Sequence, residues 1–323
     1  MDNITHSLAG ALLGEMGLKR RSRFVMAACL LGANAPDIDV FAPLVLPVDG
    51  IAFHRGPLHG IFAWPILAAA IVAILWLADR LKPRGPETPQ FRAGALFIVA
   101  FLAVLTHPFL DWLTTYAIAI FAPVSWRWYS GNAIFIIDWV YWVLMISGIG
   151  LSMWRYRKRL PNPGRPAQIA GLIMLAYIGL NLAESALVER STTAELRRRG
   201  IEPALIVAGP PPLAFWERTI EWRSADRFGS GSFTPSAGLT LETSEQPLGL
   251  DDPQLALAER TSRHVRSFMQ WSRMPIVIRL DGHSYLTDQR FYNSSESPFS
   301  NAMRRAVRRS AFLIPLDNPG SNS

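Results

Sequence analysis

Cysteine and charge are both scarce in this sequence. Cys29 is the single cysteine among 323 residues, so an intrachain disulfide is excluded and cysteine usage does not indicate a redox compartment. Charged residues make up 18% of the chain and hydrophobic residues 50%, with a mean hydropathy of +0.18. This composition is too apolar for an average soluble protein. We interpret Cys29, which lies in an apolar stretch, as a small core residue.

The N-terminus lacks the features of a cleavable signal peptide. Asp2 occupies the region where basic residues are expected, and no small-residue cleavage pattern follows. We therefore expect the first helix to remain in the mature protein.

Long apolar runs, by contrast, are abundant. A helix needs about 20 apolar residues to cross a hydrocarbon core of about 30 Å. Four segments approach or exceed this length, namely 60–78, 93–122, 133–154 and 167–183. They predict a membrane α-helical bundle with about four full spans. The first 48 residues predict an additional N-terminal hairpin of two short helices, 4–18 and 24–35, because Pro36 disfavours helix at the residue before it.

Basic residues cluster beside these runs. Residues 19–23 and the loops 79–92 and 155–166 are rich in Lys and Arg, and the positive-inside rule assigns such short segments to the cytoplasm. The net charge of +7 follows from this topology, so we do not expect nucleic-acid binding. The same rule predicts a multi-pass inner-membrane protein in which segment 115–132 and everything after residue 190 lie on the outer side.

The chain changes character after residue 188. A run of turn formers, Gly-Pro-Pro-Pro at 209–212, precedes stretches that alternate at period two, as strands with one buried face do. Residues 254–271 predict one helix. We therefore predict a membrane-embedded helical domain over 1–189, carrying the site described next, and a small, mostly β extramembrane domain over 190–323. Its tail, 318–323, is expected to be disordered.

Ionisable side chains in or beside membrane spans are costly, which makes each a candidate functional residue. The predicted topology places eight of them at the outer ends of their segments: His6, Asp37, Asp39, His54, His59, His107, Asp111 and Asp138. Four His and four Asp at one end of an apolar bundle need compensation, which a divalent cation supplies. We therefore predict that they form one cluster that binds metal.

Each pair alone has two interpretations. His107 and Asp111 are four residues apart and share a helical face, although Pro108 disfavours helix at His107. The pair could either bind one cation together or form a hydrogen bond that closes the bundle. Asp37 and Asp39 fit a metal or turn and capping chemistry. His6 alone is more typical of a satisfied interfacial histidine. A mixed N/O donor set suits Zn²⁺, with Mn²⁺ and Fe²⁺ also compatible, and the number of donors fits two metals or one metal with supporting carboxylates.

Other polar residues have simpler interpretations. Arg127 lies between Trp126 and Trp128 and has two interpretations. It is either a snorkelling Arg in an aromatic interfacial belt or a residue that binds an anionic substrate head group. His264 and His283 have no metal-like neighbours, and we interpret both as structural or surface residues.

Six motifs carry a family resemblance. They are T-H-S-L-A-G (5–10), N-A-P-D-I-D (34–39), H-R-G-P-L-H (54–59), H-P-F-L-D (107–111), R-W-Y (127–129) and F-I-I-D (135–138). Over residues 1–155 this order resembles the YdjM/YfhP-type inner-membrane proteins, described as membrane-bound metal-dependent hydrolases. More distantly it is similar to zinc-dependent phospholipase C and nuclease-type helical enzymes. Asn132 departs from the family pattern, which usually has an acidic residue there.

The resemblance implies a hydrolase that uses metal-activated water on a phosphoester or related bond of a lipid or envelope substrate. The expected ligands are His6, Asp37, His54, His59, His107 and Asp111. Asp39 or Asp138 is expected to act as a base or to orient a ligand, and Arg55 to neutralise developing negative charge. The alternative is a non-enzymatic membrane-anchored regulator with a structural metal site, whose outer domain binds a protein partner. Transport ranks last, because polar residues stop in the outer half of the membrane.

Overall fold

The structure, a computed structural model, describes residues 1–323 except 82–84, 86–87, 293–311 and 318–323. It divides into two compact units. The first comprises Met1–Leu46 and Phe53–Leu182, and the second comprises Pro47–Ala52 and Ala183–Ser323. The division falls within one long helix, seven residues before the expected boundary at 189, and it assigns the short segment Pro47–Ala52 to the second unit. The predicted tail at 318–323 lies outside the described residues.

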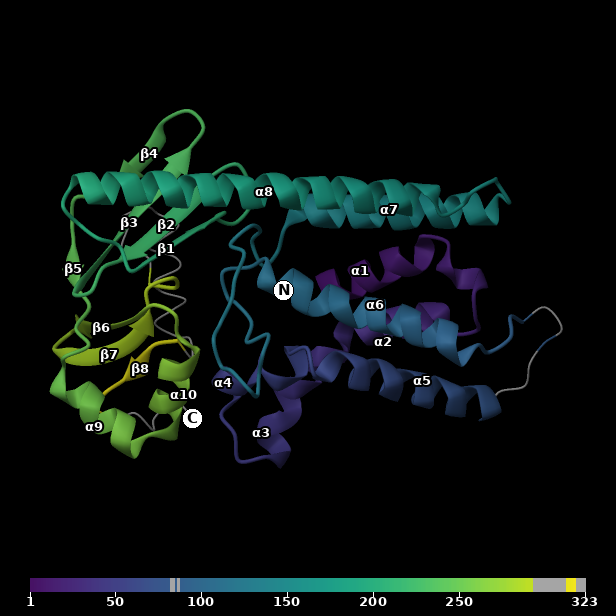
Figure 1. Ribbon diagram of the computed structural model, residues 1–323, viewed down its shortest axis with the longest axis horizontal. Coiled ribbons are helices and arrows are strands. Elements are labelled where there is room, and N and C mark those ends of the chain that lie inside the picture. The colour runs from purple at the N-terminus through teal and green to yellow at the C-terminus, as the bar shows by residue number, and fades with distance from the viewer. Residues whose placement is uncertain (82–84, 86–87, 293–311, 318–323) are drawn as a thin grey trace. The chain divides into compact units, whose positions relative to one another are not determined.

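The first unit is built from helices (Figure 1). In chain order they are α1 (Asn3–Glu15), η1 (Leu18–Arg20), α2 (Val25–Asn34), η2 (Ala35–Phe41), α3 (Ala42–Val45), α4 (Gly50–Phe53), η3 (Pro57–His59), α5 (Ala63–Leu81), α6 (Ala93–Trp112), α7 (Trp139–Arg157) and α8 (Arg165–Arg198). The last α4 residue, Phe53, belongs to this unit, while α8 continues into the second.

Four helices within the described residues are long and apolar enough to cross a membrane: Val25–Val45, Ala63–Leu81, Ala93–Trp112 and Arg165–Arg198. The number agrees with the prediction, but the set differs. The predicted span 133–154 begins as a helix only at Trp139, and its Trp, Tyr and terminal Arg residues lower its hydropathy. Val25–Val45 takes its place, because the chain continues past Pro36 as the 3-10 turn η2 and then α3 instead of breaking there.

Close helix packing in this unit depends on glycine. A Cβ at Gly10 of α1 would lie 2.6 Å from the Cys29 carbonyl oxygen, and one at Gly32 of α2 would lie 2.7 Å from Ala103 Cβ of α6. Small residues at such positions let helix backbones approach closely, as in other membrane bundles. Cys29 is fully buried in this core, as its sequence context predicted.

Helix α6 runs through Pro108 without ending, so the expected disturbance at His107 does not occur. The helix ends at Trp112, close to the start of segment 115–132, which was predicted to lie outside the span, although the apolar run itself continues to 122. Residues 113–138 are mostly irregular, with one antiparallel bridge between Ile118 and Tyr129. The segment is held to its surroundings by backbone bonds, including Ala119 N–H to the Arg55 carbonyl at 3.0 Å. Some of its apolar residues, such as Ile118 and Ile134, are buried by this tertiary packing and not by a helix.

The second unit contains two antiparallel sheets in addition to helices, which confirms the predicted mostly β character. One has strand order β1 (Leu205–Gly209), β2 (Arg218–Arg223), β3 (Arg227–Thr234), β4 (Gly238–Leu241), with β5 (Gln246–Pro247) also on β3. The other has order β6 (Pro275–Leu280), β7 (His283–Asp288), β8 (Ile314–Pro315). The prediction of a single helix over 254–271 is wrong, because the structure has two helices there, α9 (Pro253–Thr261) and α10 (Arg263–Trp271). Ser262 between them is extended, and its hydroxyl caps α10 by accepting the Val265 N–H.

Candidate metal centre

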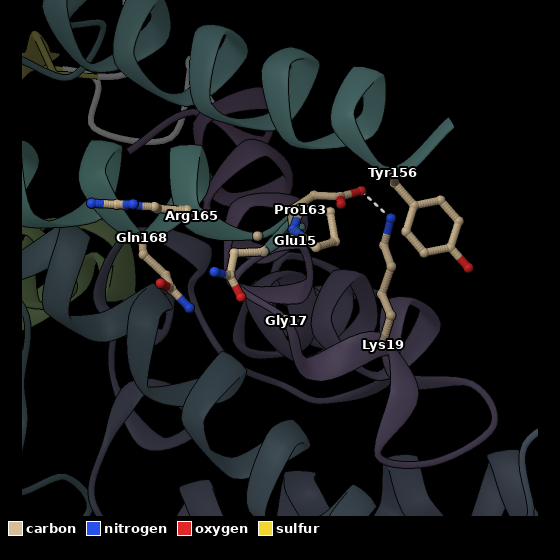
Figure 2. A pocket seen from close by; sticks show the side chains of 9 residues that line it. Glu15, Gly17, Lys19, Tyr156, Pro163, Arg165 and Gln168 are labelled. Atoms are coloured by element: carbon tan, nitrogen blue, oxygen red, sulfur yellow. Dashed lines mark hydrogen bonds and ion pairs between the residues drawn. The ribbon is translucent and has the colours of Figure 1, made fainter. Parts of the chain in front are cut away.

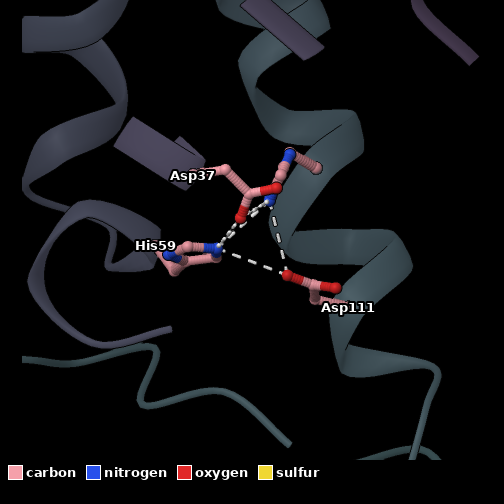
Figure 3. A group of neighbouring side chains, drawn as sticks. Asp37, His59 and Asp111 are labelled. Carbon is pink, nitrogen blue, oxygen red and sulfur yellow. Dashed lines mark hydrogen bonds and ion pairs between the residues drawn. The ribbon is translucent and has the colours of Figure 1, made fainter. Parts of the chain in front are cut away.

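Four side chains from three separate segments meet in the first unit (Figure 3). Asp37 comes from η2, His59 from the end of η3, and His107 and Asp111 from one face of α6. One ligand atom from each, His Nε2 or a carboxylate oxygen, lies within 4.8 Å of all the others. His59, His107 and Asp111 are buried, and Asp37 is 14% exposed. These four were all predicted as ligands.

The spacing of the four atoms matches a tetrahedron. His107 Nε2 lies 3.1 Å from His59 Nε2, 3.2 Å from Asp37 Oδ1 and 3.4 Å from Asp111 Oδ2. His59 Nε2 lies 3.5 Å from Asp37 Oδ1 and 3.3 Å from Asp111 Oδ2. Bonds of about 2.0–2.1 Å from a central Zn²⁺ imply a ligand-to-ligand edge of about 3.3 Å. Five of the six edges therefore have the length that a four-coordinate cation requires.

The opposite nitrogen of each histidine is directed to an acceptor. His107 Nδ1 lies 2.6 Å from the Ala33 carbonyl oxygen, so it carries the proton and leaves Nε2 with a free lone pair. His59 Nδ1 lies 3.1 Å from Asp39 Oδ2, although this contact departs from the line of a well-aligned N–H bond. Acceptors of this kind fix the ring orientation and tautomer of metal-binding histidines.

Asp39 also organises the neighbouring segment. Its Oδ1 lies 2.7 Å from His54 Nδ1, and its Oδ2 accepts the backbone N–H of Arg55 at 3.2 Å. Asp37, Asp39 and His54 form a second group of potential ligands that shares Asp37 with the first. The 2.7 Å distance is that of a hydrogen bond and not of a ligand edge, which favours a role of Asp39 in orienting the two histidines over a second metal.

The remaining oxygen of Asp111, Oδ1, faces positive and polar groups. The α-amino group of Met1 contacts it, Arg55 Nη2 lies 3.1 Å away, and His6 Nε2 lies 3.6 Å away. The His6 ring stacks on His107 at 3.6 Å between centroids. His6 therefore lies beside the four-atom group without belonging to it, which places this predicted ligand next to the site.

Arg55 is held rigidly at this position. It adopts φ 63°, a conformation that costs free energy for a residue with a side chain, and its guanidinium lies over the Tyr116 ring at 5.2 Å. Burial lowers the pKa of Arg55 to about 10, so the group remains charged at neutral pH. The side chain thus supplies a fixed positive charge beside Asp111.

The donor set fits a divalent cation. Within the described residues, its buried ligand atom Asp111 Oδ2 has no hydrogen-bond partner, and neither ring nitrogen of the adjacent His6 has one. Two lone pairs and two carboxylate oxygens directed at one point repel each other and lack solvent, and a cation there removes both costs. Two nitrogen and two oxygen ligands suit Zn²⁺, and also Mn²⁺ or Fe²⁺.

Comparison with known proteins shows the family of the chain. Residues 1–188 match the model of the YdjM inner membrane protein family. The chain belongs to the YdjM family. It is also 29% identical over 280 residues, which is 84% of this chain and 80% of the relative, to the uncharacterised protein YfhP of Bacillus subtilis (strain 168). No solved structure matches the chain.

Two predicted site residues of this YdjM family member are not brought into the cluster. Asp138 is the N-cap of α7: its Oδ1 accepts Tyr141 N–H at 3.0 Å, and its Oδ2 accepts the Tyr177 hydroxyl at 2.8 Å. It belongs to neither group of potential ligands. Arg127 is exposed, and its guanidinium lies over the Tyr129 ring at 5.5 Å, which fits the interfacial interpretation. A substrate contact by Arg127 stays a prediction.

Asn132, the departure from the YdjM pattern, has a local role. It adopts φ 52°, a left-handed conformation that Asn tolerates better than most residues, and its Oδ1 accepts the Ser130 hydroxyl at 2.7 Å. The site also contains groups that sequence reasoning missed. The Met1 amino group and the Ala33 carbonyl belong to the backbone and leave no residue-type signal, whereas Thr114, whose hydroxyl lies 3.5 Å from Arg55 Nη1, stands three positions after the Asp that ends H-P-F-L-D.

Proposed function

We propose that this protein is a membrane-bound metal-dependent hydrolase that acts on a phosphoester or related bond of a lipid or envelope substrate. The observation that carries the proposal is the tetrahedral spacing of His59, His107, Asp37 and Asp111 in a buried, apolar setting. A divalent cation bound there would lower the pKa of water toward neutrality and polarise a phosphoryl oxygen. Zn²⁺ is the first candidate for that cation.

Access to the site is expected at Asp37. Its side chain is 14% exposed, whereas those of the other three ligands are 0–1% exposed. His54 beside it is 38% exposed and is held by Asp39 through Nδ1, which leaves its Nε2 available to exchange protons with solvent. We assign Asp39 to orienting His54 and His59, His54 to proton transfer, and Arg55 to balancing negative charge that develops near Asp111.

A lipid substrate is supported by an apolar cavity along the same helix, α6, on the face that points away from His107 and Asp111; none of the four ligands lines it. The cavity has a volume of about 680 Å³ and is lined by Trp64, by residues of α6 on either side of His107 and Asp111, and by residues of the 118–129 loop. Trp64 also donates its indole N–H to the His59 carbonyl at 2.9 Å. Phe109 and Phe121 at the cavity are exposed, as residues in contact with lipid are. The volume lies in the range of ligand pockets, and an acyl chain is the apolar ligand that a membrane provides.

The second candidate is a structural metal site in a membrane-anchored regulator. It is favoured by the fact that all four vertices are protein atoms, since catalytic zinc sites usually leave one position for water. In that case the metal would fix α6 against η2 and η3, and the second unit would bind a protein partner. A measurement of turnover separates the two functions, because both require bound metal and only the hydrolase cleaves a substrate.

The decisive experiment measures metal content and hydrolysis in the full chain purified in detergent. The screen should include a long-chain phospholipid, its water-soluble head-group fragment and a simple phosphodiester. We expect metal-dependent cleavage that favours the long-chain lipid and falls at least about a hundredfold in Asp111→Asn. The matched control is Asp251→Asn, which makes the same change at an exposed residue of the second unit. Stoichiometric metal without any turnover would favour the regulator.

A further inference from the structure

A second, polar cavity lies at the other end of α1 from the metal centre (Figure 2). It has a volume of about 390 Å³ and is lined by the turn after α1 (Glu15, Gly17, Lys19), by the α7 residue Tyr156, and by the start of α8 with its preceding loop (162–165 and Gln168). Nine residues of α1 separate His6 from Glu15, about 13 Å of helix. The cavity is therefore distinct from the metal centre.

The walls of this cavity are fixed by the backbone. Gly17 adopts φ 104°, and Gly164 lies so close to the same turn that a Cβ there would be 2.7 Å from the Glu15 carbonyl oxygen and 2.8 Å from Gly17 N. Gln168 Nε2 donates to the Met16 carbonyl oxygen at 2.9 Å. The turn after α1 and the loop before α8 thus form one joined rim.

The charge around the cavity is strongly positive. Residues 15–23 and 154–168 contain nine Lys and Arg residues, four in the first segment and five in the second, and Glu15 is their only acidic residue. Glu15 is buried and ion-paired with Lys19, whose ammonium lies 5.7 Å from the centre of the Tyr156 ring. Arg165, on another side of the cavity in Figure 2, is exposed and makes no ion pair with a described carboxylate. An anion is therefore the ligand that this cavity favours.

Aromatic residues place the cavity at the depth of lipid head groups. Trp154 and Tyr156, at the end of α7, are each 52% exposed. Exposed Trp and Tyr at a helix end mark the boundary between hydrocarbon and head groups, and basic residues beside them reach the phosphates. Basic pockets between transmembrane helices on the cytoplasmic side are a known type of site for anionic lipid head groups.

We propose that this cavity binds the phosphate group of an anionic membrane phospholipid, with Lys19 and Arg165 as its positive contacts. Lys19 follows α1, which carries His6, and Arg165 is the first residue of α8. A bound head group would therefore connect the segment after α1 to the start of α8 at the basic side of the bundle. The proposal does not depend on hydrolysis at the metal centre. Free phosphate has the same recognition chemistry, and the experiment must distinguish it from the lipid.

The test uses the full chain in neutral detergent and measures binding by native mass spectrometry and by the shift in thermal unfolding. The probes are phosphatidylglycerol, phosphatidylcholine and inorganic phosphate at matched concentrations. Each basic residue near an anionic lipid surface contributes about fivefold to binding, so Lys19→Gln with Arg165→Gln should weaken phosphatidylglycerol binding about 25-fold. The matched control is Arg157→Gln with Lys158→Gln, which removes the same charge from the same segment outside the cavity.

The outcomes are distinct. Preference for phosphatidylglycerol over phosphatidylcholine that is lost in the cavity variant and kept in the control supports the proposal. Equal binding of the two lipids, or equal losses in the two double variants, overturns it. Stabilisation by inorganic phosphate as large as that by phosphatidylglycerol would overturn the lipid as the ligand. Metal content, measured in every sample, reports whether the variants have folded.

Discussion

The Nε2 atoms of His59 and His107 lie 3.1 Å apart, although 48 residues separate them in the chain. The Nδ1 proton of His107 is committed to the Ala33 carbonyl, so its Nε2 presents a lone pair to His59. Asp37 and Asp111 add two carboxylate oxygens at 3.2–3.5 Å from these nitrogens. Such an arrangement is stable in an apolar bundle when a cation occupies its centre, and this relationship is the basis of the first three predictions.

His107→Ala should release the metal while the protein still inserts into the membrane. The substitution removes one of four ligands and leaves the apolar spans that drive insertion unchanged. Metal per folded protein in detergent is the measurement, and His283→Ala is the control, because His283 is an exposed histidine of the second unit. Equal metal content in wild type and His107→Ala would remove the main ligand assignment and, with it, the proposed function.

Asp39→Asn should behave differently from His107→Ala. Asp39 contacts His54 and His59 through their Nδ1 atoms and supplies no atom to the four-ligand group. Loss of its charge should weaken metal binding or lower turnover by about 10–100-fold, while saturating metal still fills the site. A titration of metal into the metal-free variant measures this, and complete failure to bind at saturation would make Asp39 a direct ligand.

Gly32→Ala should disturb the metal centre without changing any of its side chains. The new methyl group would lie 2.7 Å from Ala103 Cβ and 2.9 Å from the Ala100 carbonyl, so α2 must move away from α6. That movement lengthens the adjacent bond between Ala33 and His107. We expect a loss of about 1–3 kcal/mol in stability, together with weaker metal binding. Gly179→Ala, with no atom within 4 Å of the added Cβ, should leave both quantities unchanged and is the matched control.

The sequence predicted the four clustered side chains better than it predicted the place of Asp138. His107 and Asp111 could be paired from helical spacing alone, and counting basic loops placed all the candidates at one end of the bundle. Depth along the membrane axis does not specify position within the membrane plane, however. Asp138 stands at the opposite end of α7 from the basic residues Arg155 and Arg157, but its carboxylate is directed to Tyr177 of α8 and to its own helix N-terminus.

Helix ends were the least predictable part of the fold. Pro36 was expected to end a short helix over 24–35, and α2 does end at Asn34, but the 3-10 turn η2 and the helix α3 continue the apolar run to Val45. The apolar run continues to 122, ten residues past the end of α6, because hydropathy does not distinguish a lipid-facing helix from an irregular segment. The Met1 amino group could not be assigned, since its contact with Asp111 depends on tertiary packing.

Topology is open to a direct test. Because loops 79–92 and 155–166 are rich in Lys and Arg, we expect both to face the cytoplasm and the second unit to lie outside. A reporter that is active only in the cytoplasm should be active when inserted in either loop and inactive when fused after Asn318. A reporter active only outside, inserted at the same sites, is the control and should give the reverse pattern. Cytoplasmic activity after Asn318 would contradict the predicted orientation.

The last prediction concerns Glu221 in β2, which is buried and accepts hydrogen bonds from the Ser230 hydroxyl at 3.0 Å and from Gln289 Nε2 at 2.9 Å. Burial, the largest cause, raises the pKa of Glu221 to about 8, whereas the unfolded chain has the ordinary value of 4.5. Between these values the folded unit retains a proton that the unfolded chain releases, so stability is highest at low pH and declines as pH rises from about 4.5 to about 8.

Each unit of pKa difference corresponds to about 1.4 kcal/mol, so the decline from this group amounts to at most several kcal/mol. Glu221→Gln keeps an oxygen acceptor for Ser230 and Gln289 and removes the ionisable group, so it should abolish most of this pH dependence and stabilise the second unit at pH 8. The measurement is urea unfolding of the full chain in detergent at pH 5.5 and pH 8, followed by hydrogen exchange of β2 and β3 peptides. Glu217→Gln, a half-buried glutamate whose backbone N–H pairs with the Ala214 carbonyl, is the control and should keep the wild-type slope. If the pH dependence of the free energy of unfolding persists unchanged in Glu221→Gln, Glu221 is ionised in the folded unit. A carboxyl group that is protonated in the folded unit predicts another result: its replacement by an amide is neutral at low pH and stabilising at high pH.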